Sequence, residues 1–278
     1  MIISVLSGKG GTGKTLISVN LASALDNALY LDCDVEEPNG FIFLKPEVTE
    51  REAVNVKSPV INVDKCLACG QCVRACQYNA LALVKEKVIV FPKICHSCGT
   101  CLLVCPAECM EEKDREIGVV EGGTAGNLTC YQGKLNVGEP ITVPIIKQLK
   151  KKINPGKNIV LDCPPGSSCS VVNSIEGSDY CLLVTEPTPF GFHDLQIAVG
   201  LVRQMGIPLG VVLNKSQAGS NIIIEYCQKE RIKLLGAIPF SQDIAKIYSQ
   251  GNLLTAQGHY WKCYFADLAY RIQEVIEG

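Results

Sequence analysis

Eight residues near the start of the chain have the types and spacing of a phosphate-binding loop. They match the pattern G-x-x-x-x-G-K-[ST] and read Gly8-Lys9-Gly10-Gly11-Thr12-Gly13-Lys14-Thr15. The glycines allow backbone N–H groups to converge on phosphate oxygens, and the start of the following helix adds partial positive charge. We expect Lys14 to reach the β- and γ-phosphates of ATP and the Thr15 hydroxyl to bind Mg²⁺. A glycine-rich turn without a ligand is the alternative.

Cysteine is the second residue type with a chemical pattern, because eight of the 16 cysteines fall within residues 66–105. They form two copies of the spacing C-x₂-C-x₂-C-x₃-C, which is that of bacterial two-cluster ferredoxins. Three closely spaced thiolates bind one cubane, and the fourth lies too far along the chain to close the same cluster. We therefore assign two 4Fe–4S clusters, one to Cys66, Cys69, Cys72 and Cys105 and the other to Cys95, Cys98, Cys101 and Cys76.

Zinc is the competing interpretation of these cysteines, because paired C-x₂-C units also suit a tetrahedral zinc site. Zinc needs four ligands per ion and no third cysteine at the same spacing, so the pattern favours iron–sulfur clusters. One departure concerns the residue after each fourth cysteine: Pro106 follows Cys105, whereas Gln77 follows Cys76. That difference puts the local turn in question, but not the ligation.

A parallel sheet would position the phosphate-binding loop. The apolar run Ile2–Leu6 precedes the loop, Thr15–Leu25 has helical apolar spacing, and Ala28–Leu31 is the next apolar run. This order predicts a βαβ unit. Later apolar runs also end in polar residues, at Ile159–Leu161, Tyr180–Val184 and Leu209–Leu213. The alternation predicts an α/β fold with a doubly wound, mostly parallel sheet that binds ligands at the carboxyl ends of its strands.

The cysteine-rich block interrupts this alternation and predicts an inserted domain. Cysteines and small residues replace the long apolar segments from residue 58 to residue 113. A hairpin-like apolar stretch, Leu81–Phe91, separates the two cysteine repeats. We therefore expect a P-loop NTPase domain formed by residues 1–57 and 114–278, with a small α+β ferredoxin-like domain at 58–113.

Lys9 supplies a resemblance to a known group of proteins. The run K-G-G-T-G-K-T, with its early second lysine, resembles the deviant Walker A motif of the MinD, ParA, Mrp and nitrogenase iron-protein superfamily. The resemblance implies a homodimer bridged by ATP, in which Lys9 crosses the interface to the nucleotide of the partner. A solvated loop lysine is the alternative. The whole chain looks like the MinD-superfamily ATPases that carry an inserted ferredoxin domain.

The resemblance also implies roles for acidic residues that follow strands. Asp32 and Asp34 occupy the positions of the switch I aspartates, and Asp162, before Pro164-Pro165-Gly166, resembles the Walker B aspartate. Asp32 and Asp162 would then hold Mg²⁺ through bound water, and Asp34 would activate the attacking water. Lys9, Lys14, Asp34 and Asp162 become the candidate catalytic residues. Each aspartate could instead be a helix cap or a turn residue.

Three further residues would contact the base of the bound ATP or ADP if the resemblance holds. Asn214 and Lys215 follow the apolar run Leu209–Leu213 and resemble the position at which an amide reads the adenine edge. Pro239 resembles the loop that packs on the base. These signals depend mainly on their order and spacing along the chain.

Composition excludes some classes of partner. The formal net charge is −2, which disfavours a generic polyanion binder, so we expect no nucleic acid. No apolar stretch approaches the roughly 18–20 residues of a membrane span. The C-terminal stretch Phe265–Ile276 contains acidic residues, unlike a basic membrane-binding helix, so no membrane partner is expected. The chain opens directly on the first strand, with no room for a signal or transit peptide, which predicts a cytoplasmic protein.

These features predict a slow, partner-stimulated, Mg²⁺-dependent ATPase that carries two clusters, and they leave three roles open. The first is ATP-gated electron transfer through the clusters to a protein redox partner, favoured because an electron carrier shares the chain with a nitrogenase-like switch. The second is assembly or delivery of iron–sulfur or other metal centres to a target protein. The third is redox-responsive positioning or regulation, as in MinD and ParA relatives.

Cys163 and Cys169 bracket the Walker B turn and could hold an extra intersubunit cluster, although core packing is the stronger interpretation.

Overall fold

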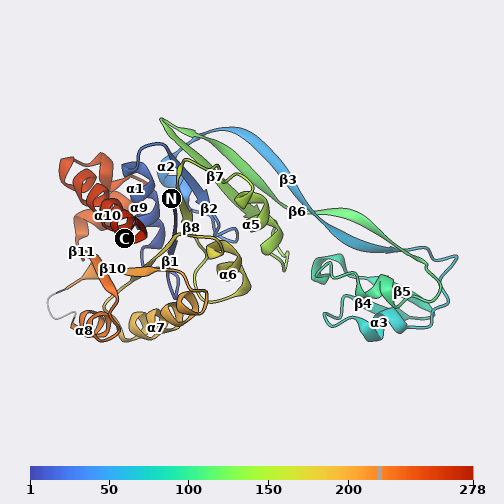
Figure 1. Cartoon of the computed structure of the whole chain (residues 1–278). Helices are drawn as coiled ribbons and strands as arrows, with labels where there is room; N and C mark the ends of the chain where they lie inside the picture. The colour runs from blue at the N-terminus through green and yellow to red at the C-terminus, as the bar shows by residue number, and fades with distance from the viewer. Residues whose placement is uncertain (218–220, 278) are drawn as a thin grey trace.

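The computed structural model describes residues 1–217 and 221–277. Within these residues a nine-stranded sheet is flanked by helices, and a two-stranded sheet lies apart from it at the end of a long β-ribbon (Figure 1). The strands of the large sheet are β1 (Ile2–Leu6), β2 (Ala28–Asp32), β3 (Glu47–Ile61), β6 (Met110–Ala125), β7 (Leu128–Leu135), β8 (Asn158–Asp162), β9 (Tyr180–Thr185), β10 (Leu209–Ser216) and β11 (Lys233–Pro239).

The helices of the main body alternate with these strands along the chain. They are α1 (Lys14–Ala24), α2 (Gly40–Leu44), α5 (Val143–Lys150), α6 (Cys169–Ile175), α7 (Pro189–Gln204), α8 (Asn221–Lys229), α9 (Gln242–Ser249) and α10 (His259–Glu277), with a 3₁₀ turn, η2 (Leu254–Ala256). None of the helices in the described ranges combines the length and the hydropathy needed to cross a bilayer.

The order of the strands confirms the predicted doubly wound, mostly parallel sheet. The strands run β11-β10-β9-β1-β8-β2-β7-β6-β3 across the sheet. All neighbours from β11 to β7 pair in parallel, whereas β6 pairs antiparallel with both β7 and β3. Strand β1 lies between β8 and β9, so the loop after β1 opens at the centre of the carboxyl edge.

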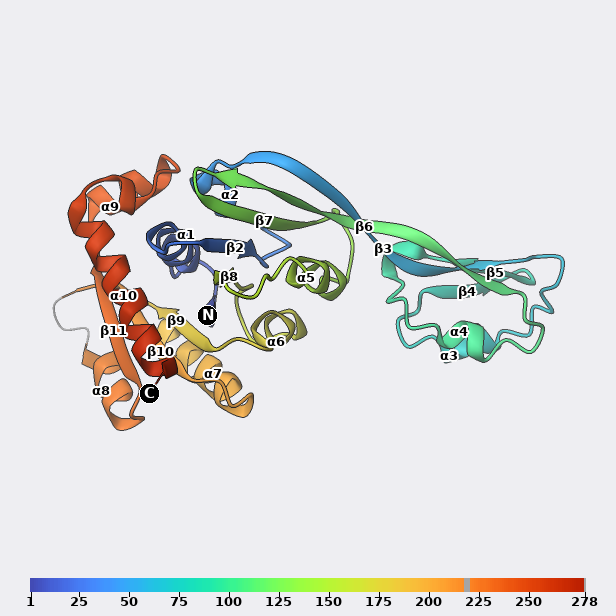
Figure 2. The same cartoon turned by 45° about the horizontal axis from the view of Figure 1, so that its top comes forward.

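Two apolar cores lie on opposite faces of the sheet, because successive side chains of a strand point to opposite sides. Leu29 and Leu31 of β2 face the layer of α5, α6, α7 and α8, whereas Ala28 and Tyr30 face α1, α2 and α10. Figure 2 shows α1 and α10 on one side of the strands and α5, α6 and α7 on the other. The strands between these layers are buried on both faces, which explains their continuous apolar runs.

Strands β3 and β6 continue beyond the sheet as a two-stranded ribbon, and this feature is absent from the sequence prediction. The pairing of β6 with β7 ends at Gly118, apart from one hydrogen bond from the Asn136 N–H to the Ile117 carbonyl oxygen, and residues 55–61 and 110–117 continue as a pair. We call these two segments the β-arm. The predicted domain boundaries, 58 and 113, fall in the middle of the β-arm, where Ser58 pairs with Lys113.

Residues 62–109, which we call the cysteine module, sit at the far end of the β-arm (Figure 1). The module contains α3 (Gln71–Ala75), β4 (Leu81–Val84), β5 (Lys87–Val90), a 3₁₀ turn η1 (Pro92–Ile94) and α4 (Thr100–Leu103). Strands β4 and β5 pair from Leu81↔Val90 to Val84↔Lys87, which confirms the hairpin predicted over Leu81–Phe91. A small separate core supports the module: Cys72, Leu81, Cys101, Cys109 and Met110.

The β-arm allows a direct test of the division into two units. Ile61 and Met110 lie opposite each other, so an Asn-Gly turn can replace residues 62–109 and close a two-residue hairpin. Because neither large core contains a residue of 62–109, we expect the shortened protein to melt within about 4 °C of the full chain, equivalent to about 1 kcal/mol. Circular dichroism would measure this; a collapse of the cooperative transition would show that the division is wrong.

Candidate functional site

The phosphate-binding loop joins β1 to α1 and depends on glycine at two of its bends. Gly11 and Gly13 have φ values of 80° and 92°, a region that other residues enter only with strain. A Cβ on Gly13 would also collide with the Asn214 amide. That amide donates to the Thr12 carbonyl oxygen at 2.7 Å, so Asn214 braces the loop from β10.

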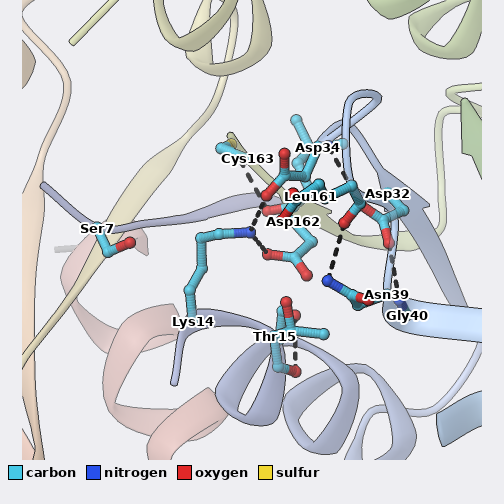
Figure 3. A network of polar contacts seen from close by, with 12 residues as sticks. Ser7, Lys14, Thr15, Asp32, Asp34, Asn39, Gly40, Leu161, Asp162 and Cys163 are labelled. Carbon is cyan, nitrogen blue, oxygen red and sulfur yellow. Dashed lines mark hydrogen bonds and ion pairs between the residues drawn. The ribbon is translucent and has the colours of Figure 1, made fainter. Parts of the chain in front are cut away.

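Three aspartates lie near Lys14 at the carboxyl edge of the sheet, and two of them, Asp162 and Asp34, contact it (Figure 3). Asp32 and Asp162 are register partners at the ends of β2 and β8. The Lys14 ammonium lies 2.5 Å from Asp162 Oδ1 and 3.4 Å from Asp34 Oδ2. Asp32 accepts hydrogen bonds from the backbone N–H groups of Gly40 at 2.8 Å and Asp34 at 3.2 Å. The parallel register therefore brings together all the acidic residues that the sequence singled out.

Burial and mutual repulsion shift the pKa values in this group. Burial, followed by the charge of Asp162, raises the pKa of Asp32 above its usual range. Burial is also the largest cause at Asp34, where it outweighs the attraction of Lys14 and raises the pKa to about 6. At Lys14, burial lowers the pKa, but attraction to Asp162, Asp34 and Asp32 outweighs it, and the net pKa is raised.

The composition of this group suits a divalent cation. Three carboxylates lie near one ammonium, and burial, to which the charge of Asp162 adds, raises the pKa of Asp32 and Asp34. Carboxylate and hydroxyl oxygens are the ligands that Mg²⁺ prefers. Thr15 lies on the first turn of α1, next to Lys14, and its side chain is near Asp162 at the end of β8 (Figure 3). Thr15, Asp32 and Asp162, which the sequence assigns to Mg²⁺, therefore form a donor set that fits the ion.

A cavity of about 630 Å³ opens next to this group. Its walls contain most of the residues that the sequence assigns to nucleotide: Gly10, Gly11, Gly13, Lys14, Thr15, Asn214, Lys215 and Pro239. Gly8, Lys9 and Thr12 lie outside this lining. Gly8 instead allows close approach of α7, since a Cβ there would meet the Asp194 backbone. On the side of Pro239, Phe240 and Tyr248 add flat apolar surface of the kind that stacks on a base.

Lys9 and Lys215 share one carboxylate, Glu186, at the end of β9. Lys9 Nζ lies 2.6 Å from Glu186 Oε1, and Lys215 Nζ lies 3.0 Å from Oε2. Lys215 also donates to the Gly11 carbonyl oxygen at 2.8 Å. Burial alone would raise the pKa of Glu186, but its hydrogen bonds with the two lysines keep it lowered. The ion pairs hold Lys9 against its own chain, at the rim of the phosphate-binding loop.

The cysteine module brings together the two sets of thiols that the sequence predicts. One small cavity is lined by Cys66, Cys69, Cys72 and Cys105, and a second by Cys95, Cys98, Cys101 and Cys76. No three His, Cys, Asp or Glu side chains in the described ranges are arranged to hold a single metal ion. The four thiolates of a 4Fe–4S cluster each bind a different iron, a wider arrangement than the ligands of one ion. The crosswise grouping of the thiols therefore fits such clusters.

Cys163 and Cys169, which the sequence analysis considered as ligands of an extra intersubunit cluster, lie in different environments. Cys163 is fully buried, and its thiol donates to the Leu161 carbonyl oxygen at 3.7 Å, whereas Cys169 is exposed. Cys163 is thus a core residue in this structure, because it points into the layer beneath the sheet that contains α6 and α7. An intersubunit cluster that uses Cys163 is not compatible with this position.

Some residues at the site were missed by the sequence analysis. Tyr30 donates from its hydroxyl to Asp162 Oδ2 at 3.0 Å, but in the sequence it is one more apolar residue of a buried strand. Glu186 directly follows the apolar run of β9, and a polar residue at the carboxyl end of a parallel strand is the signal that could have identified it. Phe240 and Tyr248 carry no local signal.

Comparison with known proteins places this site in a wider group. Residues 3–254 match the family model described as the CobQ/CobB/MinD/ParA nucleotide binding domain. The uncharacterized protein MJ0579 of Methanocaldococcus jannaschii is 31% identical over 259 residues, covering 91% of this chain and 90% of that protein. The iron-sulfur cluster carrier protein of Pyrococcus horikoshii is 25% identical over 260 residues, covering 85% of this chain and 73% of the relative.

Two solved structures share the fold. The cell division ATPase MinD of Pyrococcus furiosus superposes with a TM-score of 0.60 at 19% identity, covering 99% of this chain and 98% of MinD. The MinD of Pyrococcus horikoshii, complexed with Mg-ADP, gives a TM-score of 0.57 at 20% identity, covering 99% and 96%. The fold and the loop between β1 and α1 define a P-loop NTPase of the MinD type. The chain belongs to the CobQ/CobB/MinD/ParA nucleotide-binding family.

The buried carboxyl of Asp32 predicts a specific pH dependence of stability. Its pKa lies above the ordinary value of 3.8, so the folded state binds more protons than the unfolded state between these two pKa values. The free energy of unfolding should therefore fall as pH rises from about 4 through the raised pKa. In Asp32→Asn this decline should flatten, measured by denaturant unfolding in EDTA without nucleotide between about pH 5 and about pH 8.

Asp64→Asn is the matched control for this prediction, because Asp64 is an exposed carboxylate of the cysteine module. Its pH profile should follow that of the wild type. An Asp32→Asn profile with the same slope as the wild type would show that Asp32 does not titrate in this way.

Proposed function

We propose that this protein is an ATP-hydrolysing iron–sulfur protein in which nucleotide-dependent dimerisation controls electron transfer through two 4Fe–4S clusters. The observation that carries this proposal is a continuous set of hydrogen-bonded strands. It leads from the aspartates beside the nucleotide cavity, through the edge of the sheet and the β-arm, to the cysteine module.

The residues around the cavity support ATP hydrolysis. The Lys14 ammonium contacts Asp162 and Asp34 and would exchange these contacts for oxygens of the β- and γ-phosphates. Mg²⁺, held through Thr15, Asp32 and Asp162, would neutralise phosphate charge. Asp34, with a pKa of about 6, is suited to accept a proton from the attacking water near neutral pH.

The path to the cysteine module begins at the segment that follows β2. Val35, one residue after Asp34, accepts a hydrogen bond at its carbonyl oxygen from the Leu135 N–H at the end of β7, at 2.8 Å. Asp32 is the register partner of Gln132 in β7. Gln132 in turn donates from its side chain to Glu121 of β6 at 2.8 Å. A shift of residues 32–35 on nucleotide exchange would thus pull on β7 and β6.

Strand β6 carries that displacement onward, because it is continuous from Glu121 through the β-arm to Met110. Met110 belongs to the small core of the cysteine module. The module lies at the far end of the β-arm from the nucleotide cavity (Figure 2). Nucleotide would therefore act on the clusters through the position of the β-arm, and through docking of the module to a redox partner, rather than through direct contact.

One observation favours a second function, the delivery of iron–sulfur clusters to target proteins. A relative of this chain bears the name iron-sulfur cluster carrier protein. The same nucleotide site would then time cluster release rather than electron flow. The two functions differ in what leaves the protein: iron and sulfide in one case, electrons alone in the other.

The proposed homodimer makes Lys9 the residue that distinguishes ATP from ADP. For Lys9→Ala we expect normal binding of MgADP and no dimer with a non-hydrolysable ATP analogue, because the cation that would reach the partner's nucleotide is gone. Lys14→Ala should lose nucleotide binding and dimerisation together. Size-exclusion chromatography with light scattering measures both; a Lys9→Ala dimer equal to that of the wild type would contradict the proposed role.

Coupling between nucleotide and clusters predicts a shift in reduction potential. An anaerobic redox titration of the full chain would be run without nucleotide, with MgADP and with the ATP analogue. We expect one cluster to shift by about 59 mV or more between these states, equivalent to about 1.4 kcal/mol of coupling. By linkage, reduction would change nucleotide affinity by about tenfold.

Two variants control this titration. Lys14→Ala should retain its clusters and show no nucleotide-dependent shift, whereas Cys98→Ala should bind nucleotide and lose one cluster. Identical potentials in all three nucleotide states of the wild type would refute coupled electron transfer. Release of iron and sulfide to an apo-acceptor protein in the ATP state would instead support the carrier function.

A further inference from the structure

A fifth cysteine lies at the first of the two thiol sets. Cys109 lines the same cavity as Cys66, Cys69, Cys72 and Cys105. Its sulfur is 3.4 Å from that of Cys105, and the residue is only 3% exposed. The spacing C-x₂-C-x₂-C-x₃-C does not include Cys109, and neither cluster assignment uses it.

The internal repeat shows that this thiol is an addition to one site only. Each cysteine of the first repeat recurs 29 residues later, so Cys105 corresponds to Cys76 and Cys109 corresponds to Ala80. The turns that lead to these positions are alike, since Glu108 and Asn79 both have positive φ, at 46° and 54°. At the second site the Ala80 N–H donates to the Cys76 sulfur at 3.3 Å, and no thiol follows.

The backbone at Cys109 is anchored to the β-arm. Its carbonyl oxygen accepts a hydrogen bond from the Asn62 N–H at 2.7 Å, which extends the pairing of β3 with β6 by one step. Strand β6 begins at the next residue, Met110. Cys105, in contrast, lies in the turn after α4 and is partly exposed. The thiols of Cys105 and Cys109 are therefore within contact distance, although Cys109 is hydrogen-bonded to the β-arm and Cys105 belongs to the turn after α4.

We propose that Cys109 is an exchangeable alternative to Cys105 as the fourth ligand of the first cluster; this rests on the proposed presence of that cluster. The 3.4 Å separation of the two sulfurs means that either can approach the same iron corner with a small rotation. The geometry of the second site offers no such alternative, because the residue at the corresponding position is Ala80.

The exchange balances without an oxidant or a reductant. Cys109 forms an Fe–S bond as the Fe–S bond of Cys105 breaks. The thiol proton of Cys109 passes to the sulfur of Cys105, with which it is already in hydrogen-bond contact. The number of thiolate ligands, the charge of the site and the oxidation state of the iron do not change. Before the exchange, the Cys109 thiol donates to the Cys105 sulfur, and such a hydrogen bond tunes the cluster's potential.

The chain itself provides the matched variants for a test. Cys105→Ala and Cys76→Ala each remove the fourth ligand, but only the first leaves an alternative thiol at the same site. After anaerobic reconstitution of the full chain, iron, sulfide and electron paramagnetic resonance would be measured. We expect Cys105→Ala to keep two 4Fe–4S clusters. Cys76→Ala and the double variant Cys105→Ala/Cys109→Ala should each convert one cluster to a 3Fe–4S form or lose it.

The outcomes separate this inference from the proposed function. A wild-type protein that holds no clusters would refute the proposed function itself. Two intact clusters in the wild type, with loss in Cys105→Ala equal to that in Cys76→Ala, would overturn only the role of Cys109. Should Cys105→Ala lose both clusters, which would show that its cysteine module has not folded, Cys105→Ser keeps nearly the same volume. Equal cluster content in Cys105→Ser and Cys105→Ser/Cys109→Ala would then overturn the inference, and a higher content in the single variant would support it.

Discussion

The site depends on the contact of Lys14 with Asp162 and Asp34 at the carboxyl edge of the sheet. Charges this deeply buried are tolerated only when they are paired, because desolvation of an isolated charge costs several kcal/mol. The parallel register of β1, β8 and β2 forces the three carboxylates together, and the phosphate-binding loop brings the one ammonium to them. The same surplus of negative charge makes the site receptive to a divalent cation.

The antiparallel edge of the sheet, next to this site, also carries the cysteine module. Strands β7, β6 and β3 add an antiparallel section to an otherwise parallel sheet. Antiparallel strands can continue beyond a sheet as a ribbon because their hydrogen bonds need no crossover helix. The β-arm is such a continuation, and it places the cysteine module at a distance from the nucleotide. In the proposed function, a cluster carried in this way would be accessible to a partner protein, while β7 remains hydrogen-bonded to the segment after β2.

The two cysteine repeats are similar in backbone and different in chemistry. Both have a glycine with positive φ before the short helix, Gly70 and Gly99, and a matching turn after the fourth cysteine. One difference bears on the thiol sites: Cys109 corresponds to Ala80, and Cys109 lies where the module joins the β-arm. Both sites adjoin the β-arm: Cys109 of the first site directly precedes β6, and the cavity of the second site is lined by Lys57, Pro59 and Glu112 of the β-arm.

The sequence alone determined the parts that depend on local chemistry. Glycines at tight bends, a lysine at the start of a helix and cysteines at short spacing act within a few residues, so the loop at Gly13 and Lys14 and the two groups of four cysteines could be predicted. The alternation of buried runs also predicted the parallel sheet. Only the tertiary structure decided contacts between distant segments, such as Lys9 with Glu186 and Tyr30 with Asp162.

The β-arm and Cys109 were hidden for the same physical reason. A two-stranded ribbon exposes much of both faces, so the polar residues of the β-arm resemble those of a linker. The spacing of cysteines along the sequence does not reveal that the sulfurs of Cys105 and Cys109 lie in contact, because that contact depends on how β6 folds back beside the turn. Local patterns report which groups are present, whereas long-range pairing decides which of them come within reach of one another.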